Sequence, residues 1–500
     1  MTACYVGIDS GLTVTKAAVF DAAGRCLGAG SAPSVHVNPA DGVVETDPEE
    51  QWQAVAAAIR GALERAAMPP SAIAAAGITA HGDCVYLADA AGVPVRPAIP
   101  SLDFRGAQIA AGWREDGTAQ RLLDIIGEVP HPHHVHATLR WLADHEPQSL
   151  ADARWVLFAK DWLRLRLTGT VGTDLTDATA GFVDVRSSRY SDEALAACGL
   201  ERLAGKLPPI GPSGAAAGTV TEQAAAVTGL PAGTPVACGV HDITAAALGS
   251  GLADTTTALL VAGTYSVNAV LAERPAIGAG WLCRHWAEPG RWIVMSTSAT
   301  SASNLAWAVE QLGLSTGDGA ERYAAVDREV AEVLDDDPRI VFHPFLFGTP
   351  ASAHASAALL GLRSWHRRGH VYLAMLQGIA FSHRQHLETL ARGRDITGVL
   401  LAGGAANSAV WTQIFADTLG LPVTVPAAPE AGALGAAMCA MVAAGRHPTI
   451  GDAVAATART RRAHVPAPAG QERMQAAYER FTATADAAAV HVWPALGGKP

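Results

Sequence analysis

One local pattern occurs twice in this chain of 500 residues, and it constrains the fold more than any other feature. Near the N-terminus the apolar run Tyr5 to Ile8 precedes a Gly/Thr turn and a second apolar run, Ala17 to Phe20. Near the middle, Thr257 to Ala262 and Val267 to Leu271 flank the turn Gly263-Thr264-Tyr265-Ser266. The repetition predicts two related halves, each beginning with two strands joined by a short turn.

Predicted helices and strands alternate along the rest of the chain. Pro48 to Met68 spaces its apolar residues by three and four, which predicts an amphipathic helix, and Ile73 to Ile78 is expected to be a buried strand. The later elements alternate in the same way, helix first: Val371 to Leu390, Gly398 to Leu401, Ser408 to Leu419, Val423 to Val425 and Gly432 to Ala444. This order predicts an α/β architecture.

Composition excludes several classes of protein. Apolar residues make up 49% of the chain and charged residues 17%, which predicts a large packed core. The net charge of −11 and the lack of long basic runs argue against nucleic acid or an anionic membrane as partner, so a small molecule is expected. Seven singly spaced cysteines and the absence of a signal-peptide pattern favour the cytoplasm. The uncharged stretch Ile396 to Ala416 contains too many polar residues for a membrane span.

The first candidate site is the turn Asp9-x-Gly11-x-Thr13. Backbone N–H groups and a hydroxyl in such a turn can bind phosphate, and a carboxylate at a strand end can hold Mg²⁺. The turn lacks the Walker spacing and precedes a strand, so it is not a P-loop. The alternative is that Asp9 and Gly11 only build a tight turn.

Two further glycine-containing turns could bind a nucleotide. Gly263-Thr264 would supply a second phosphate contact from the other half of the chain. Gly403-Gly404 follows a buried strand and allows a flat ligand to approach the backbone, with Asn407 at the start of the next helix. The alternative for Asn407 is a helix cap.

Asp242, in the segment Gly239-Val240-His241-Asp242, precedes a small-residue helix. A carboxylate there could accept the proton of a hydroxyl that attacks phosphorus. Taken alone, Asp242 is more simply explained as a helix N-cap.

Polar residues also follow the predicted strands of the first half. His81, Asp103 and Arg105 suit a ligand with many hydroxyl groups, whereas the alternative is an internal Asp103–Arg105 ion pair and a core histidine. The run His131-Pro132-His133-His134-Val135-His136 is predicted to be a solvated loop, because its spacing matches no structural zinc pattern and it lacks cysteine partners.

Taken together, these motifs resemble those of the FGGY carbohydrate kinases, in order, from the first strand to about Gly445. The family's first phosphate motif is matched at Asp9, Gly11, Thr13 and Lys16, although Leu12 replaces the usual Thr. The catalytic motif falls on Gly239 and Asp242, the second phosphate motif on Gly263 and Thr264, and the adenosine motif on Gly403, Gly404 and Asn407. Lys160-Asp161-Trp162-Leu163 and Thr176-Asp177-Ala178 resemble structural motifs of the N-terminal lobe.

The resemblance implies an actin-like (ribonuclease H-like), duplicated, two-lobed ATPase fold. Expected boundaries are 1–248 for a sugar-binding N-terminal lobe, 249–465 for an ATP-binding C-terminal lobe and 466–500 for a C-terminal helix and tail. It implies ATP and Mg²⁺ as cofactors, Asp242 as general base and substrate contact, and Asp9 as metal ligand. A homodimer is compatible with these features.

The substrate is less constrained than the reaction. Ala80-His81-Gly82 resembles an element of xylulose kinases, and Ser101-Leu102-Asp103 with Arg105 is similar to L-xylulose and erythritol kinases. A pentulose or related keto-sugar is therefore the first choice, with an erythritol- or glycerol-type polyol as alternative. The rival from another class is an actin-like ATPase switch without a sugar substrate, which would not need His81, Asp103 and Arg105.

Overall fold

The computed structural model describes residues 3–312, 319–349 and 354–496. The chain forms two compact units, each assembled from several segments. The first contains Met1–Ala253, Ala272–Val294 and Ala428–Arg459, and the second contains Asp254–Leu271, Met295–Ala427 and Thr460–Pro500. In the described ranges no helix is both long and apolar enough to cross a membrane.

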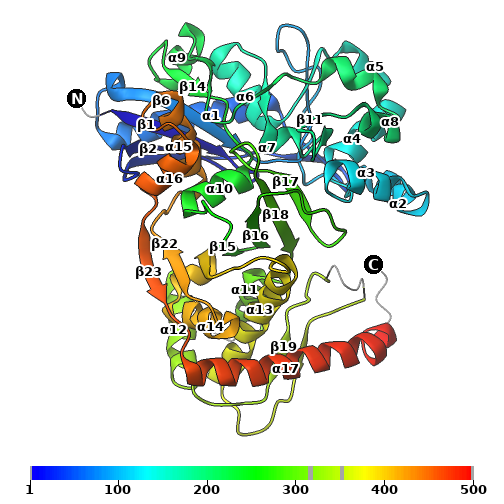
Figure 1. The fold of residues 1–500 in the computed structure, drawn as a ribbon, viewed down its shortest axis with the longest axis vertical. Coiled ribbons are helices and arrows are strands. Elements are labelled where there is room, and N and C mark those ends of the chain that lie inside the picture. Colours follow the sequence, from blue (N-terminus) through cyan, green and yellow to red (C-terminus); the bar gives the residue numbers. More distant parts are fainter. Residues whose placement is uncertain (1–2, 313–318, 350–353, 497–500) are drawn as a thin grey trace. The chain divides into compact units, whose positions relative to one another are not determined.

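The first unit is built on a six-stranded sheet with the order β13-β14-β6-β1-β2-β3. Figure 1 labels four of these strands, β1, β2, β6 and β14. β1 pairs antiparallel with β2 and parallel with β6. The strands are β1 (Cys4–Ser10), β2 (Val14–Asp21), β3 (Cys26–Pro33), β6 (Ile73–Ala80), β13 (Ala216–Thr219) and β14 (Pro235–Ala237). The predicted strand, turn and strand at the N-terminus is therefore confirmed.

Helices cover both faces of this sheet. α1 (Pro48–Ala66) begins at the cap Asp47 with Pro48 in its first turn, and its buried Trp52 and Val55 join a core that contains Val6 and Ile8 of β1. Side chains alternate along a strand, so Gly7 points to the opposite face. There α15 (Ala431–Ala443) packs so closely that a Cβ atom on Gly7 would lie 1.7 Å from the Ala433 carbonyl oxygen.

A buried ion cluster joins two motifs of the first unit. Lys160, on α6 (Ala159–Thr168), is fully buried, and its Nζ lies 2.7 Å from Asp161 Oδ1, 3.2 Å from Asp174 Oδ1 and 3.3 Å from Asp177 Oδ2. Asp177 belongs to α7 (Leu175–Ala178). Burial would lower the pKa of Lys160, but the three carboxylates raise it well above its usual value. The lysine therefore stays charged and holds the two segments together.

The second unit repeats the same strand relationships. β15 pairs antiparallel with β16 and parallel with β21, as β1 does with β2 and β6. These strands belong to a seven-stranded sheet with the order β17-β18-β16-β15-β21-β22-β23, in which β17 and the start of β18 come from the segment Ala272–Val294 of the first unit. Its strands are β15 (Thr257–Ala262), β16 (Ser266–Ala272), β17 (Leu282–His285), β18 (Trp292–Ser298), β21 (Gly398–Ala402), β22 (Val423–Pro426) and β23 (Thr460–His464). The duplication predicted from the sequence is thus present in the topology.

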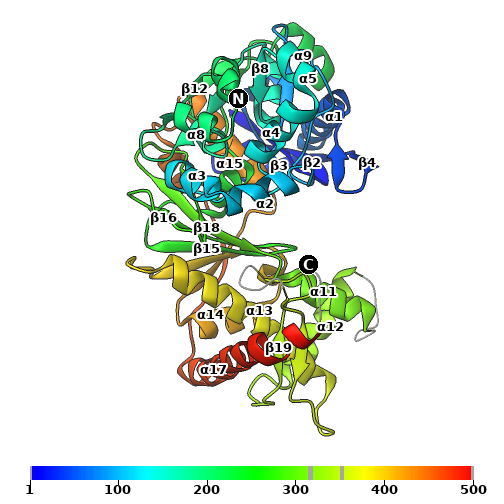
Figure 2. The ribbon, with the colours of Figure 1, turned by 90° about the vertical axis from the view of Figure 1, so that its right-hand side faces the viewer.

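Three helices of the second unit stack below its sheet in Figure 2, with α13 and α14 between the strands and α17. They are α13 (Arg368–Leu390), α14 (Ala409–Leu419) and α17 (Pro468–His491). α13 is buried along most of its length, whereas α17 buries fewer residues. The helices expected at 371–390 and 408–419 are therefore confirmed with small shifts of their ends.

Candidate active site

Three carboxylates and one lysine meet in the first unit. Asp9 lies near the end of β1, Asp242 is the first residue of α10 (Asp242–Ser250), and Glu430 immediately precedes α15. Lys16 Nζ lies 2.9 Å from Glu430 Oε2. Burial and then the charge of Asp242 raise the pKa of Asp9 to about 7, although Lys16 opposes the shift. The cluster has an excess of negative charge, which is the setting in which a divalent cation binds.

The turn after Asp9 is tight, as the alternative interpretation expected. The Gly11 N–H donates to the Val14 carbonyl oxygen at 3.2 Å, and the Ser34 N–H donates to the Thr13 carbonyl oxygen at 3.0 Å. These hydrogen bonds describe the turn itself, and phosphate binding by Gly11 and Thr13 stays a prediction.

Asp242 is held from one side and open on the other. The Ile243 N–H donates to Asp242 Oδ1 at 2.7 Å, and His241 Nδ1 lies 2.9 Å from the same oxygen. Burial would raise the pKa of Asp242, but the charge and hydrogen bond of His241 and the Ile243 N–H hold it below its usual value. The side chain is 36% exposed. An ionised carboxylate at neutral pH, with one oxygen available, can accept a proton.

The helix-cap interpretation of Asp242 is wrong in its position. His241 occupies the N-cap of α10, with extended backbone, and Asp242 already belongs to the first turn. A carboxylate in the first turn still interacts favourably with the helix dipole.

An arginine from a distant segment supports this residue pair. Arg284, on β17, places Nη1 3.1 Å from His241 Nε2, while the other ring nitrogen of His241, Nδ1, contacts Asp242 Oδ1. Arg284 Nη2 lies 2.9 Å from Asp83 Oδ1, and its Nε lies 2.9 Å from Glu128 Oε2. The guanidinium is 2% exposed. Arg284 thereby orients His241, which in turn orients Asp242.

His81 is buried in the same unit. Its Nδ1 has no hydrogen-bond partner among the described residues, and its Nε2 lies 3.4 Å from Gln51 Nε2. Burial lowers the pKa of His81 to about 4, with Asp242 opposing that shift, so the ring is neutral at pH 7. His81 Nδ1 is therefore available for a hydrogen bond with a ligand hydroxyl, and Asp242 is close enough to influence the pKa of the ring.

Asp103 and Arg105 form the internal ion pair that was their alternative. Arg105 Nε lies 2.9 Å from Asp103 Oδ1, and both side chains are at most 2% exposed. Arg105 Nη2 also contacts Glu45 Oε1 at 3.1 Å, while Asp103 Oδ2 accepts the Val44 N–H at 2.7 Å. These polar atoms already have protein partners, so a sugar contact by this pair stays a prediction with less support than His81.

The second unit brings two of the predicted nucleotide turns together. Gly403 has φ +83°, and a Cβ atom there would lie 2.6 Å from the Ala262 carbonyl oxygen and 2.9 Å from the Gly263 nitrogen. Thr264, in the same turn as Gly263, is exposed. Glycine at 403 is thus needed both for its backbone angle and for the close approach of the two turns.

The cap interpretation of Asn407 is wrong. Asn407 is the last residue of the short helix Gly404–Asn407, and its Oδ1 lies 3.4 Å from Arg461 Nη1. Ser408 caps α14 instead, because its side chain accepts the Trp411 N–H at 3.0 Å. An Asn followed by Ser offers two caps, and sequence alone did not separate them.

Sequence reasoning missed several members of the site. The sequence predicts no role for Asp83, His241 or Glu430. The residues next to Arg284 and Glu128 in the sequence do not indicate a role, because their partners lie more than 40 positions away. Arg284 contacts His241, and Glu128 contacts Arg284. The prediction of a solvated histidine loop is also wrong in part, since His134 and His136 are buried.

Comparison with known proteins agrees with this arrangement. Residues 4–249 match the N-terminal domain of the FGGY family of carbohydrate kinases, and residues 254–444 match its C-terminal domain. The chain is 33% identical over 443 residues to a probable L-xylulose kinase of Pasteurella multocida, which covers 87% of this chain and 90% of the relative. It is 31% identical over 485 residues, 96% of each chain, to the L-xylulose/3-keto-L-gulonate kinase of Escherichia coli.

The fold agrees as well. The crystal structure of a xylulose kinase from Rhodospirillum rubrum superposes with a TM-score of 0.88 at 28% identity, covering 97% of this chain and 99% of that one. This match confirms the predicted actin-like α/β fold class. The chain belongs to the FGGY family of carbohydrate kinases and is an ATP-dependent sugar kinase.

Proposed function

We propose that this kinase transfers the terminal phosphoryl group of ATP to a hydroxyl group of a pentulose, with L-xylulose as the first candidate. Two relatives more than 30% identical over most of the chain carry L-xylulose in their names. A polar, neutral His81 near Asp242 is compatible with a polyhydroxylated substrate. A four-carbon polyol is the nearest alternative.

The observation that carries the catalytic proposal is the geometry of Asp242. Both contacts described above use Oδ1, so Oδ2 is the proposed acceptor of the substrate proton. The lowered pKa keeps the carboxylate ionised but makes it a weak base. Phosphoryl transfer depends mainly on positioning and charge stabilisation, so a well-placed weak base is sufficient.

Asp9 is the proposed ligand of Mg²⁺. Burial, and then the charges of Asp242 and Glu430, raise its pKa, and a divalent cation would stabilise its ionised form. Bound Mg²⁺ would neutralise charge on the transferred phosphoryl group. Asp9 would hold the cation directly or through water, with Glu430 next to it.

ATP contacts are proposed at the glycine turns. In the first unit these are Gly11, Thr13 and Lys16, where Lys16 is 40% exposed and could turn from Glu430 to a phosphate oxygen. In the second unit they are Gly263, Thr264, Gly403, Gly404 and Asn407, supported by the close approach of the turns at Gly263 and Gly403. His81 and Asp242 are the proposed sugar contacts, and Asp103 with Arg105 is the less supported candidate because the two side chains pair with each other. A cytoplasmic location, a homodimer and the lobe boundaries at residues 248 and 465 remain proposals.

The proposal is tested by ADP release with a panel of acceptors at fixed ATP and Mg²⁺. We expect the highest kcat/KM with L-xylulose or another ketopentose, and little ADP without sugar. A tetritol or glycerol that exceeds every ketopentose by tenfold would replace the pentulose assignment. Equal ADP release with and without every acceptor would support the ATPase switch instead.

A further inference from the structure

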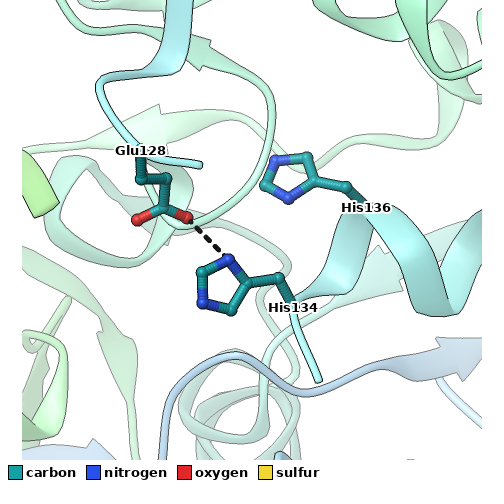
Figure 3. Close-up of side chains that lie close together, drawn as sticks. All are labelled: Glu128, His134 and His136. Carbon is teal, nitrogen blue, oxygen red and sulfur yellow. Dashed lines mark ion pairs between the residues drawn. The ribbon is translucent and has the colours of Figure 1, made fainter. Parts of the chain in front are cut away.

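Three side chains of types that can ligate a metal converge beside Arg284 in the first unit. Glu128 follows α3 (Thr118–Ile126), His134 is the N-cap of α4 (Val135–His145), and His136 lies in the first turn of α4. Figure 3 shows the carboxylate and both rings turned toward the same space. One ligand atom from each residue lies within 4.8 Å of the other two.

The converging atoms are buried and lack partners. Glu128 Oε1, His134 Nδ1 and His136 Nδ1 each have no hydrogen-bond partner in the described part of the chain. The side chains of Glu128, His134 and His136 are at most 3% exposed. Buried polar atoms normally have a partner, so three such atoms that face one another are suited to share one ligand.

The opposite atom of two of these side chains is already fixed. His136 Nε2 lies 2.6 Å from the Gly181 carbonyl oxygen, so it carries the hydrogen and leaves a lone pair on Nδ1. Arg284 Nε donates to Glu128 Oε2 at 2.9 Å, which leaves Oε1 as an acceptor. Outer hydrogen bonds of this type orient the ligands in metal sites.

The remaining contact identifies the kind of ligand. Glu128 Oε1 and His134 Nδ1 are 3.4 Å apart, close to the separation of two ligands on one tetrahedral cation at about 2.1 Å from each. A cation can interact with a lone pair on each of the three atoms, and His134 presents one at Nδ1 in the tautomer that carries its hydrogen on Nε2. Two imidazoles with one carboxylate suit a transition metal such as Zn²⁺ better than Mg²⁺, which prefers oxygen.

We propose that Glu128, His134 and His136 form a site for one divalent transition-metal ion of the Zn²⁺ type. The three ligand atoms lie up to 4.8 Å apart, so small side-chain rotations must bring them closer together before all three can contact one ion. The ion would fix Glu128, and through Glu128 the Arg284 guanidinium that also contacts Asp83 and His241. Its role is to position this network, and it is separate from the Mg²⁺ proposed at Asp9.

The direct test is Zn²⁺ binding to the untagged full chain after chelator treatment, by isothermal titration at pH 7.5 without ATP or sugar. We expect one equivalent per chain in the wild type and at least about 100-fold weaker binding in His136→Ala and Glu128→Gln, since even outer-shell changes cost 10–100-fold. The exposed His145, at the far end of α4, gives the control His145→Ala, which should bind as the wild type does.

Thermal unfolding provides the second measurement. Zn²⁺ should raise the Tm of the wild type and of His145→Ala, but not that of Glu128→Gln, which keeps the side-chain shape and is the variant to use if His136→Ala does not fold. Absence of a one-equivalent site in the wild type, or equal affinity in wild type and Glu128→Gln, overturns the proposal. Because neither measurement uses turnover, its failure is distinct from failure of the kinase assignment.

Discussion

Gly432 and Asp9 approach each other so closely that a side chain at position 432 would collide with the carboxylate. A Cβ atom on Gly432 would lie 2.1 Å from Asp9 Oδ2. The contact joins the end of β1 to the start of α15, 423 positions apart in the sequence. The position of Asp9, the proposed Mg²⁺ ligand, therefore requires glycine at position 432.

Gly432→Ala should displace Asp9 and lower kcat at least tenfold, with a higher Mg²⁺ concentration needed for half-maximal rate. The reason is that catalytic groups tolerate displacements of only about 1 Å before the rate falls by up to 10²-fold. Gly112→Ala is the matched control, because a Cβ atom there meets nothing within 4 Å. Equal Mg²⁺ dependence in both variants would remove Asp9 from the metal site.

Asp9→Asn should change how stability depends on pH. The pKa of Asp9 rises from 3.8 to about 7 on folding, so the folded state binds the proton more tightly and wild-type stability falls as the pH rises between these values. The asparagine does not ionise, so the free energy of unfolding of the variant does not fall in this way. At pH 8 the variant should be more stable than the wild type by up to about 4 kcal/mol, whereas at pH 3 it should have no such advantage. Urea unfolding without divalent cations measures the difference.

The exposed Asp41 gives the control Asp41→Asn, which should follow the wild type at both pH values. If Asp9→Asn also follows the wild type, the carboxylate carries no uncompensated charge in the folded chain, and the electrostatic argument for Mg²⁺ at this position is wrong.

His81→Ala should raise the sugar KM or lower kcat/KM for sugar by about 10- to 100-fold with little change in ATP affinity. The variant removes a neutral ring whose Nδ1 has no hydrogen-bond partner among the described residues. A core role would instead lower Tm and weaken both ligands together. Sugar KM, nucleotide titration and Tm on the same preparation separate these outcomes.

Asp103→Asn and Arg105→Lys provide the comparison for His81→Ala. Their buried pair is built into the fold, so these variants should lose stability before they lose sugar selectivity. A selective rise in sugar KM with unchanged Tm would restore the original prediction that this pair contacts the substrate.

Lys160→Met should destabilise the first unit by about 3–5 kcal/mol, because three buried carboxylates then lose their common cation. Adding Asp177→Asn should recover part of the loss, since burial, together with the neighbouring carboxylates, raises the pKa of Asp177 to about 7 even with Lys160 present. Denaturant unfolding of both single variants and the double variant measures this coupling. Additive losses would show that Asp177 is independent of Lys160.

Much of the fold followed from local patterns in the sequence. The paired strands around Gly11 and Gly263 and the helix from Pro48 were predictable, because periodicity and turn residues act over a few positions. The ordered motifs also identified the family, and they predict Asp242 as the base. Periodicity, turn residues and motifs extend over only a few positions. They therefore predict where helices and strands lie in the sequence, but not which of them contact one another.

The interactions that support the site were not predictable, because they join distant segments. Arg284 contacts Asp83 across 201 positions, and nothing around Cys283-Arg284-His285 indicates that partner. The burial of His134 and His136 depends likewise on Gly181 and Glu128. For Asp103 and Arg105 the sequence left a ligand contact and an internal ion pair open, and only the fold shows that the ion pair forms.

The central claim is that Asp242 accepts the proton of the sugar hydroxyl, and single-turnover phosphorylation by Asp242→Asn tests it most directly. The amide keeps the shape and loses the acceptor, so the chemical step should slow by 10²- to 10⁴-fold while nucleotide affinity stays within about threefold. Asp124→Asn, an exposed residue on α3, is the control and should react at the wild-type rate. An Asp242→Asn variant that retains more than about a tenth of the wild-type rate would contradict the claim and leave Asp242 a structural residue of α10.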